Sequence, residues 1–204
     1  MTRLGRIVPV LPNALTVARV LVIPPLVLFV LQSQDGSSLA AAALFAAAAL
    51  TDALDGHLAR SRDSVTTFGK IADPIADKLL VGAALISLVA VSRLAAWIAA
   101  VIMVRELAVS GLRAVAGREG LVISASRFGK AKMALQVATI LALIAAPDAS
   151  AMWLLGLLYL TVAVTIASGI DYFVAFRQRA TPAAVAVRPK PARTAKPATK
   201  RIAP

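Results

Sequence analysis

Residues 51–77 read TDALDGHLARSRDSVTTFGKIADPIAD and carry five aspartates within a strongly apolar chain, four of which, Asp52, Asp55, Asp73 and Asp77, fall in two closely spaced pairs. Asp52 and Asp55 are three residues apart, so on a helix both carboxylates lie on one face. Asp73 and Asp77 are four residues apart and have the same property. Acidic side chains close to hydrocarbon are costly and usually functional. Two such pairs would form an all-oxygen cluster with up to four negative charges, which requires cations.

The composition around this stretch is that of a polytopic membrane protein. Of the 204 residues, 59% are hydrophobic and 16% are charged, and the mean hydropathy is +0.82. This apolar share exceeds that of an ordinary soluble domain. Cysteine is absent, which excludes disulfides, thiolate catalysis and cysteine-ligated zinc. His57 is the only histidine, so it is weak evidence for a metal ligand, and we interpret it as an interface residue.

Six segments approach the roughly 20 apolar residues that a bilayer core of about 30 Å requires. The sequence therefore predicts an all-α integral membrane bundle of six transmembrane helices. They lie at about residues 14–32, 38–60, 67–91, 94–116, 127–146 and 151–176. We expect Pro12 and Asn13 to cap the first helix and Pro24-Pro25 to kink it. Arg19, near its start, either extends to the lipid headgroups or serves the site.

Positive charge predicts how these helices are oriented. With a cytoplasmic N-terminus, the outer loops contain only Arg93, and this asymmetry favours both termini inside. The basic residues on the inner side would be Arg3, Arg6, Arg60, Arg62, Lys70, Arg113, Arg118, Arg127, Lys130, Lys132, Arg177 and Arg179. Asp52 lies 14 residues after Ser38, or about 21 Å along a helix. The acids are therefore expected at the cytoplasmic boundary of an inner, or plasma, membrane.

The net charge of +12 comes largely from the end of the chain. From Arg177 onward there are eight basic residues and no acids (Arg177, Arg179, Arg188, Lys190, Arg193, Lys196, Lys200 and Arg201). A basic tail after an apolar body suits an anionic membrane surface better than nucleic acid. We expect a catalytic membrane domain at 1–178 and a disordered Pro/Ala/Lys tail at 179–204. We expect no cleavable signal peptide at Met1–Pro12, since no small-residue cleavage pattern follows it.

The acid cluster predicts a particular chemistry. Carboxylate oxygens without histidine or cysteine select Mg²⁺, Mn²⁺ or Ca²⁺. Four acids can hold two such ions about 4 Å apart, which suits displacement at phosphorus. Gly56 leaves a notch beside Asp55 and Ala59 is small one turn later. Arg60 offers a planar donor fork for phosphate. Gly69 would relieve crowding where the following helix passes the site.

These residues together resemble the signature of the CDP-alcohol phosphatidyltransferase family. The pattern is Asp52-x-x-Asp55-Gly56-x-x-Ala59-Arg60, eight residues, Gly69, three residues, Asp73, three residues, Asp77. Further segments resemble the phosphatidylglycerophosphate-forming branch: LPNALTVARVLVIPPLV at 11–27, ADPIADK at 72–78, RELAVSGLR at 105–113 and SASRFGKAKMALQ at 124–136. Met133 replaces a threonine common in that branch. The tail beyond about Gln178 lies outside the resemblance.

The resemblance implies a homodimer in which each subunit has six transmembrane helices and an active site that faces the cytoplasm. The implied reaction joins CDP-diacylglycerol and sn-glycerol 3-phosphate to give phosphatidylglycerophosphate and CMP. Asp52, Asp55 and Asp73 match metal ligands. Asp77 matches a residue that shares in metal binding and acts as the general base. Gly56, Ala59 and Arg60 match the part that binds CDP-diacylglycerol, and we assign Gly69 to the same site.

The acceptor, a small dianion, needs donors outside the metal site. Candidates are Arg105, Arg113, Arg118, Lys130 and Lys132. Arg105 and Glu106 are expected a few turns inside a membrane helix, where each requires a partner or ligand. Gly129, Lys132 and Gln136 share one helical stripe, as do Glu106, Ser110 and Arg113. The loop residues have the simpler explanation of positive-inside topology. Lys78 either neutralises Asp77 or serves the site.

Two other functional readings fit the same residues. A sister enzyme would use the same motif with inositol phosphate, serine or phosphatidylglycerol as the acceptor. A cation transporter would use the acids as an ion path, although transporters favour charges near the midplane on broken helices. A purely structural membrane protein is a third possibility.

Overall fold

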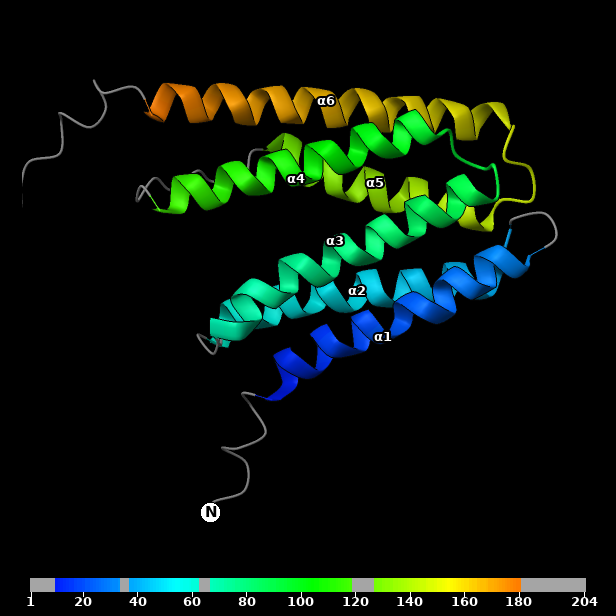
Figure 1. Ribbon diagram of the computed structural model, residues 1–204, viewed down its shortest axis with the longest axis horizontal. Helices are drawn as coiled ribbons and strands as arrows, with labels where there is room; N and C mark the ends of the chain where they lie inside the picture. The colour runs from blue at the N-terminus through cyan, green and yellow to red at the C-terminus, as the bar shows by residue number, and fades with distance from the viewer. Residues whose placement is uncertain (1–9, 34–36, 63–66, 119–126, 181–204) are drawn as a thin grey trace, which may run out of the picture.

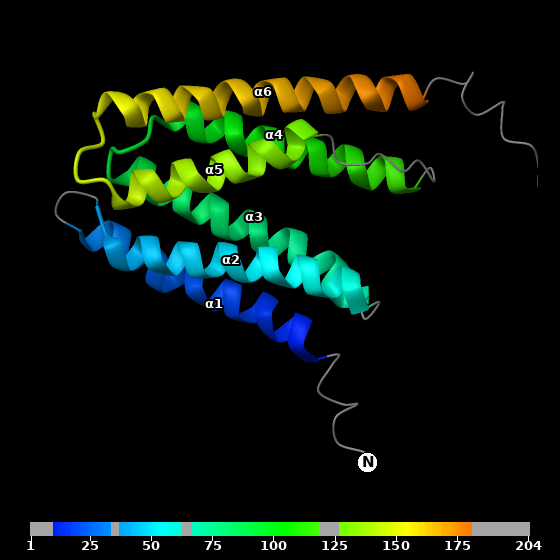
Figure 2. The same cartoon turned by 180° about the vertical axis from the view of Figure 1, so that it is seen from behind.

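The described part of the chain folds into six long helices, shown in the computed structural model of Figures 1 and 2. The structure describes residues 10–33, 37–62, 67–118 and 127–180, with side chains for 17–33, 37–51, 74–117, 129 and 131–178. The helices are α1 (Val10–Gln32), α2 (Leu39–Arg62), α3 (Thr67–Ala90), α4 (Ala96–Arg118), α5 (Arg127–Ala145) and α6 (Met152–Ala180). No strand occurs in these ranges. The predicted all-α fold and its six helices are confirmed.

Successive helices run in opposite directions along the long axis of the bundle (Figures 1 and 2). One end therefore gathers the first turns of α1, α3 and α5 and the last turns of α2, α4 and α6. We call it the motif end, because the aspartate motif spans the last turns of α2 and the first turns of α3. The opposite end holds the connections at 33–38, 91–95 and 146–151.

Two groups of helices make up the bundle, α1–α3 and α4–α6. In the first group α1 packs against α2 and α3, and in the second α6 packs against α4 and α5. Contacts of α2 with α5 and of α3 with α4 join the groups. The shared core contains Leu26, Phe45, Leu85, Leu88, Ile102 and Leu143. In Figure 1 the two groups spread apart towards the motif end, so it is the opposite end that holds the bundle together most closely.

The alanine-rich start of α2 forms a close helix interface. Ala41, Ala42 and Ala48 are buried around Phe45. Small side chains let helix backbones approach closely.

The helix boundaries differ from the predicted ones by a few residues. The prediction that Pro12 and Asn13 cap the first helix is wrong, because α1 begins at Val10. A proline is tolerated in a first helical turn, where its missing N–H has no intrahelical partner. The fourth helix begins at Ala96 rather than at about 94, since Leu94 lies in the 91–95 connection, where its N–H donates back to the Leu88 carbonyl of α3. Ala95 then accepts the first bonds of α4, from Ile98 and Ala99.

Arg93 has a structural role at the opposite end of the bundle. It is 7% exposed, its Nε donates to the Leu143 carbonyl at 2.9 Å, and its Nη2 donates to the Ala146 carbonyl. The Ser38 N–H donates to the Ile144 carbonyl at 2.9 Å. The carbonyls at the end of α5 have no partner within their own helix, and here they accept hydrogen bonds from donors in two other connections, 33–38 and 91–95. Arg93, the one basic residue predicted outside, is therefore a buried cap and not a free surface charge.

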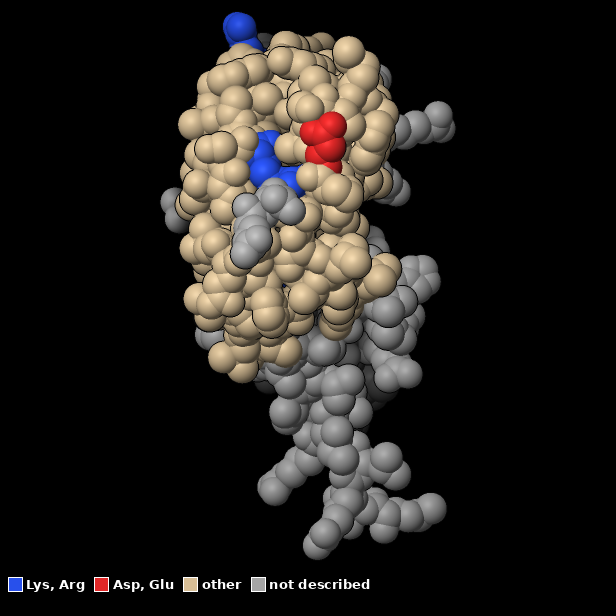
Figure 3. Space-filling model, turned by 90° about the vertical axis from the view of Figure 1, so that its right-hand side faces the viewer, with Lys and Arg blue, Asp and Glu red and all other residues tan. Residues whose placement is uncertain are grey.

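Charged groups cover little of the described surface at this end. Figure 3 looks onto it and shows small neighbouring blue and red patches within a tan surface. Asp148 lies in the 146–151 connection and accepts hydrogen bonds from the Ser150 hydroxyl at 2.7 Å and from the Ser150 N–H at 2.8 Å. These two bonds, first the side-chain one and then the backbone one, lower the pKa of the Asp148 carboxyl.

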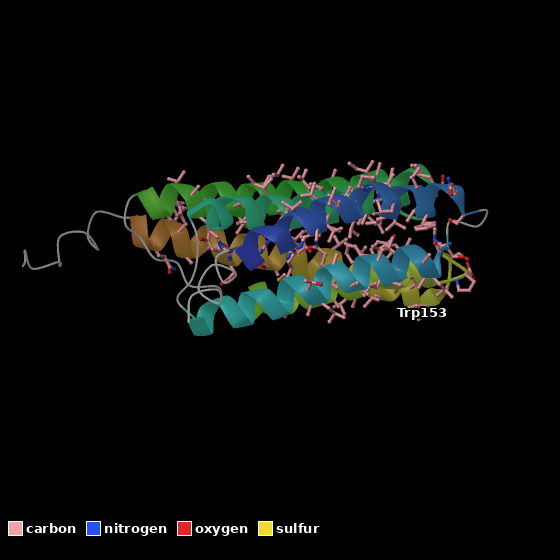
Figure 4. All side chains as sticks on the ribbon, turned by 90° about the horizontal axis from the view of Figure 1, so that it is seen from below. Trp153 is labelled. Carbon is pink, nitrogen blue, oxygen red and sulfur yellow. The ribbon has the colours of Figure 1, made fainter. Side chains whose placement is uncertain are left out.

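Large apolar side chains cover the outside of the bundle. Leu21, Ile86, Val104, Leu107 and Ile170 are each more than half exposed. Trp97 and Trp153 are exposed at the starts of α4 and α6, and Figure 4 shows Trp153 at the opposite end of the bundle. Among the described residues, one segment, Met152–Gln178, is long and apolar enough by composition to cross a bilayer. Val17–Gln32, Leu39–Thr51 and Ala131–Ala145 are shorter apolar stretches.

Candidate active site

The aspartate motif occupies two helices at the motif end. Asp52 and Asp55 lie on α2, and Asp73 and Asp77 lie on α3. Within each pair, the helical spacing therefore matches the predicted one. The side chains of Asp52, Asp55 and Asp73 are outside the described residues, as are those of Ala59, Arg60 and His57 and the surroundings of Gly56 and Gly69. Asp77 is described and is half-buried.

No group of three or more histidine, cysteine, aspartate or glutamate side chains is found in the part of the chain whose side chains are described. Three of the four motif acids fall outside that part. What the fold provides is a set of four carboxylates on two helices at the same end of the bundle, and this donor set fits a hard divalent cation. The metal site itself remains a prediction from the sequence.

A second cluster of charges brings α4 and α5 together. Lys132 on α5 is 4% exposed, and its Nζ forms an ion pair with Oε1 of Glu106 on α4. Arg105 Nη1 lies 3.6 Å from the same carboxylate oxygen. Lys132 is also within electrostatic range of Asp77 on α3. The predicted acceptor residues Arg105 and Lys132 therefore meet around one carboxylate, near the proposed general base.

The predicted need of Arg105 and Glu106 for partners is confirmed. Arg105 Nη2 also donates to the Ser168 hydroxyl on α6 at 2.5 Å. Arg105 Nε and Gln136 Oε1 are nevertheless buried without a hydrogen-bond partner among the described residues, as are the hydroxyls of Thr165 and Tyr172 on α6. Such groups are costly to leave unpaired. The hydrogen-bonding capacity of this polar cluster is therefore not fully used within the described residues.

A polar face of α6 was missed from the sequence. Thr161, Thr165, Ser168 and Tyr172 are all buried, in the helix that is otherwise apolar enough to cross a membrane alone. Their spacing of four, three and four residues places them on one stripe. Thr161 bonds Thr139 of α5 at 2.6 Å between the hydroxyls, and the Tyr172 ring lies under the Arg113 guanidinium, 5.4 Å from Cζ to the ring centroid. The signal was present as polar residues at helical spacing within an apolar run.

The remaining candidates fall into different settings. Arg113 is exposed apart from its contact with Tyr172, and the side chains of Arg118 and Lys130 are outside the described residues. Lys78 Nζ donates to the Pro74 carbonyl of its own helix at 3.2 Å. Arg19 is 5% exposed, so the alternative in which it extends to the headgroups is wrong. Its helix packs against both α2 and α3, which encloses the side chain.

An apolar groove of about 470 Å³ runs between α4 and α6. Its walls include Val104, Ala108, Ile166 and Ile170, and Arg105 is the charged residue among those that line it. Arg105 therefore separates the apolar outer groove from the polar contacts inside.

Comparison with known proteins identifies the family. The sequence model of the CDP-alcohol phosphatidyltransferases matches residues 9–167, which include the whole aspartate motif and most of the helical bundle. The chain belongs to the CDP-alcohol phosphatidyltransferase family. Members of this family are membrane-associated transferases that in general depend on a divalent cation. Ser168 and Tyr172 lie just beyond the matched range.

Several relatives within the family bear the name CDP-diacylglycerol–glycerol-3-phosphate 3-phosphatidyltransferase. The one from Bacillus subtilis is 41% identical over 179 residues, covering 80% of this chain and 93% of its own. The one from Pseudomonas fluorescens is 40% identical over 171 residues, covering 79% and 87%. A Mycobacterium tuberculosis protein named probable phosphatidylglycerophosphate synthase is 38% identical over 167 residues, covering 79% of both chains.

Proposed function

We propose that this protein transfers the phosphatidyl group of CDP-diacylglycerol to sn-glycerol 3-phosphate, giving phosphatidylglycerophosphate and CMP. The observation that carries the proposal is the similarity to relatives named for this reaction, which covers 79–80% of this chain and 87–93% of theirs. It is supported by an intact aspartate motif on two helices at one end of the bundle. The charged cluster beside Asp77 supplies the cationic groups that an anionic acceptor requires.

In this proposal the four motif acids hold Mg²⁺ or Mn²⁺, most simply as two ions. Asp52, Asp55 and Asp73 serve as ligands and Asp77 shares in the binding. When bound, the metal offsets the negative charge of the diphosphate and of the departing CMP. Gly56, Ala59 and Gly69 leave room for CDP-diacylglycerol, and Arg60 binds its phosphates as a planar fork.

Asp77 is the proposed general base. Its carboxylate accepts the proton of a free hydroxyl of glycerol 3-phosphate. That hydroxyl oxygen then forms a bond to the phosphorus that carries diacylglycerol, while the bond from this phosphorus to the bridging oxygen of CMP breaks. The half-buried position of Asp77, within electrostatic range of Lys132, is consistent with a base that faces a partly enclosed site.

We assign binding of the acceptor phosphate to Arg105, Arg113 and Lys132, with Arg118 and Lys130 as further contacts. Glu106 uses only part of the hydrogen-bonding capacity of its two neighbours, since an ammonium has three donors and a guanidinium has five. The buried and unpaired Arg105 Nε supports this assignment. Glu106 would then hold the two cations together in the absence of substrate.

We further propose that all six helices cross the inner (plasma) membrane, with both termini and the motif end in the cytoplasm. Helices α1 to α4 have 23 or 24 residues, about 35 Å at the usual rise, and so exceed the hydrocarbon thickness. Exposed tryptophans at one end and basic side chains at the other support this orientation. A soluble acceptor and a lipid-anchored donor could then meet at the cytoplasmic boundary.

Three further features of the proposal rest on the family resemblance and on composition. The enzyme works as a homodimer in the membrane. Residues 1–178 form the catalytic domain, and the basic segment 179–204 is an accessory tail that interacts weakly with anionic lipid rather than with nucleic acid.

A panel of acceptors tests the reaction. Purified protein in detergent–lipid micelles would be given CDP-diacylglycerol and, separately, glycerol 3-phosphate, inositol phosphate, serine or phosphatidylglycerol. We expect CMP release and a phosphatidylglycerophosphate product only when glycerol 3-phosphate is the acceptor. EDTA should abolish turnover, and Mg²⁺ or Mn²⁺ should restore it. Turnover with inositol phosphate but not with glycerol 3-phosphate would refute the acceptor assignment and leave the family chemistry intact.

A further inference from the structure

Helix α6 makes two contacts with the basic residues of α4 in the same order along both helices. Arg105 donates a hydrogen bond to the Ser168 hydroxyl. About two turns further along α4, Arg113 lies over the ring of Tyr172, which is about one turn beyond Ser168 on α6. The helices run in the same direction and pack against each other, so the contacts form successive rungs towards the motif end. Neither α6 residue belongs to the aspartate motif or to the range matched by the family model.

We propose that Ser168, Gly169 and Tyr172 are positioning residues that aim the Arg105 and Arg113 guanidiniums at the phosphate of the acceptor. This inference rests on the proposed function, in which these two arginines bind that phosphate. It adds α6 to an acceptor site whose candidates otherwise lie on α4, on α5 and in the connection between them.

The surroundings of Arg105 explain why it needs such support. Its side chain is half-buried, with the apolar groove on one side and Glu106 at 3.6 Å on another. Without Ser168, the guanidinium could turn fully towards the Glu106 carboxylate. Ser168 is 2% exposed. Its hydroxyl accepts a hydrogen bond from Arg105 Nη2, and this bond holds one edge of the guanidinium away from Glu106.

Gly169 permits the close approach of the Arg105 stem. A Cβ atom at this position would lie 3.3 Å from Arg105 Cγ, closer than most such contacts. Any larger residue would shift the arginine by a few tenths of an ångström. The glycine and the serine therefore act on the same side chain from adjacent positions of α6.

Tyr172 acts on Arg113 through its ring. Tyr172 is 6% exposed, so neighbouring side chains hold its ring in place, whereas Arg113 is exposed and faces away from the core. A guanidinium over an aromatic face is attracted to it and keeps its edge donors available for phosphate. The Tyr172 hydroxyl has no hydrogen-bond partner among the described residues, and the proposed role does not require one.

Steady-state kinetics of the full-length enzyme test the proposal. Each substrate would be varied in turn for Ser168→Ala, Ser168→Thr, Tyr172→Leu and Tyr172→Phe. Loss of a hydrogen bond to a charged group is worth about tenfold in binding, so Ser168→Ala should raise the KM for glycerol 3-phosphate by about that factor. Tyr172→Leu should raise it by about fivefold. The KM for CDP-diacylglycerol should stay within twofold, and Ser168→Thr and Tyr172→Phe should behave like the wild type.

Two further variants separate positioning from stability. Thr161→Val removes the Thr139–Thr161 hydrogen bond from the same buried face of α6 without touching an arginine, and should leave both KM values unchanged. In an Arg105→Ala background, Ser168→Ala should add nothing, because its effect passes through Arg105. The proposal is overturned if Ser168→Ala and Tyr172→Leu change both KM values equally, or if Tyr172→Phe behaves like Tyr172→Leu. If Arg105→Ala and Arg113→Ala leave the acceptor KM unchanged, the acceptor site itself is misassigned.

Discussion

At the residue scale, the sequence revealed which charges need partners but not which partners they have. Adjacent Arg105 and Glu106 inside an apolar helix made pairing necessary. The actual contacts, Lys132 on α5 and Ser168 on α6, come from helices separated by one or two connections in the chain. Spacing along one helix carries no information about neighbours across helices, so these partners required the fold.

Asp77 gives the sharpest prediction at this scale. Asp77→Asn keeps the size of the side chain but cannot accept a proton, so CMP release should fall by at least about 100-fold. Raising Mg²⁺ or Mn²⁺ well above the wild-type requirement should not restore the rate, because lost basicity differs from weakened metal affinity. Thermal unfolding in detergent should change little. Ile75→Ala, an exposed neighbour on α3, is the matched control and should retain the wild-type rate. Recovery of Asp77→Asn at high metal concentration would assign Asp77 to metal binding alone.

At the element scale, apolar segments and turn residues predicted six helices closely, because each segment must satisfy its backbone internally in a membrane. The ends were less predictable. The start of α4 depends on where the Leu94 N–H finds its acceptor, which is a carbonyl of the preceding helix. The end of α5 depends on Arg93, a residue more than 50 positions earlier than its acceptor at Ala146. Such caps are tertiary contacts and leave little trace in local sequence.

The cap at the end of α5 predicts a stability effect. Arg93→Ala would remove two hydrogen bonds from a charged donor and leave the Leu143 and Ala146 carbonyls buried. We expect a loss of about 2–3 kcal/mol in the free energy of unfolding, measured in detergent or bicelles. Arg93→Lys should recover part of it. Ser150→Ala, which removes one exposed hydrogen bond at the same end, is the control and should change the free energy by less than about 0.5 kcal/mol. An equal effect of Arg93→Ala and Ser150→Ala would show that the cap is unimportant.

At the scale of the whole molecule, charge and burial together separate the two ends of the bundle. The motif end carries the aspartates and the acceptor-site cations, whereas Arg93 at the opposite end is buried in the α5 cap. This sharpens the positive-inside argument, since the single basic residue predicted outside does not act as a surface charge. Among the described residues, α6 contains the one segment that is long and apolar enough to cross a bilayer, even though a buried polar stripe runs along it.

Orientation can be measured directly because the chain has no cysteine. Single variants Ser150→Cys, in the connection before α6, and Gln178→Cys, near the end of α6, would place one thiol at each end of the bundle. Both positions are exposed. In intact bacterial cells or right-side-out vesicles, a membrane-impermeant maleimide should label Ser150→Cys and should reach Gln178→Cys only after permeabilisation. The cysteine-free parent controls for background, and turnover of each variant confirms that the fold is kept. The apolar span of α6, Met152–Gln178, is 27 residues long, so a transmembrane α6 would place the two thiols on opposite sides of the membrane. Labelling of both thiols from the same side would therefore exclude a transmembrane α6 and with it the six-span topology.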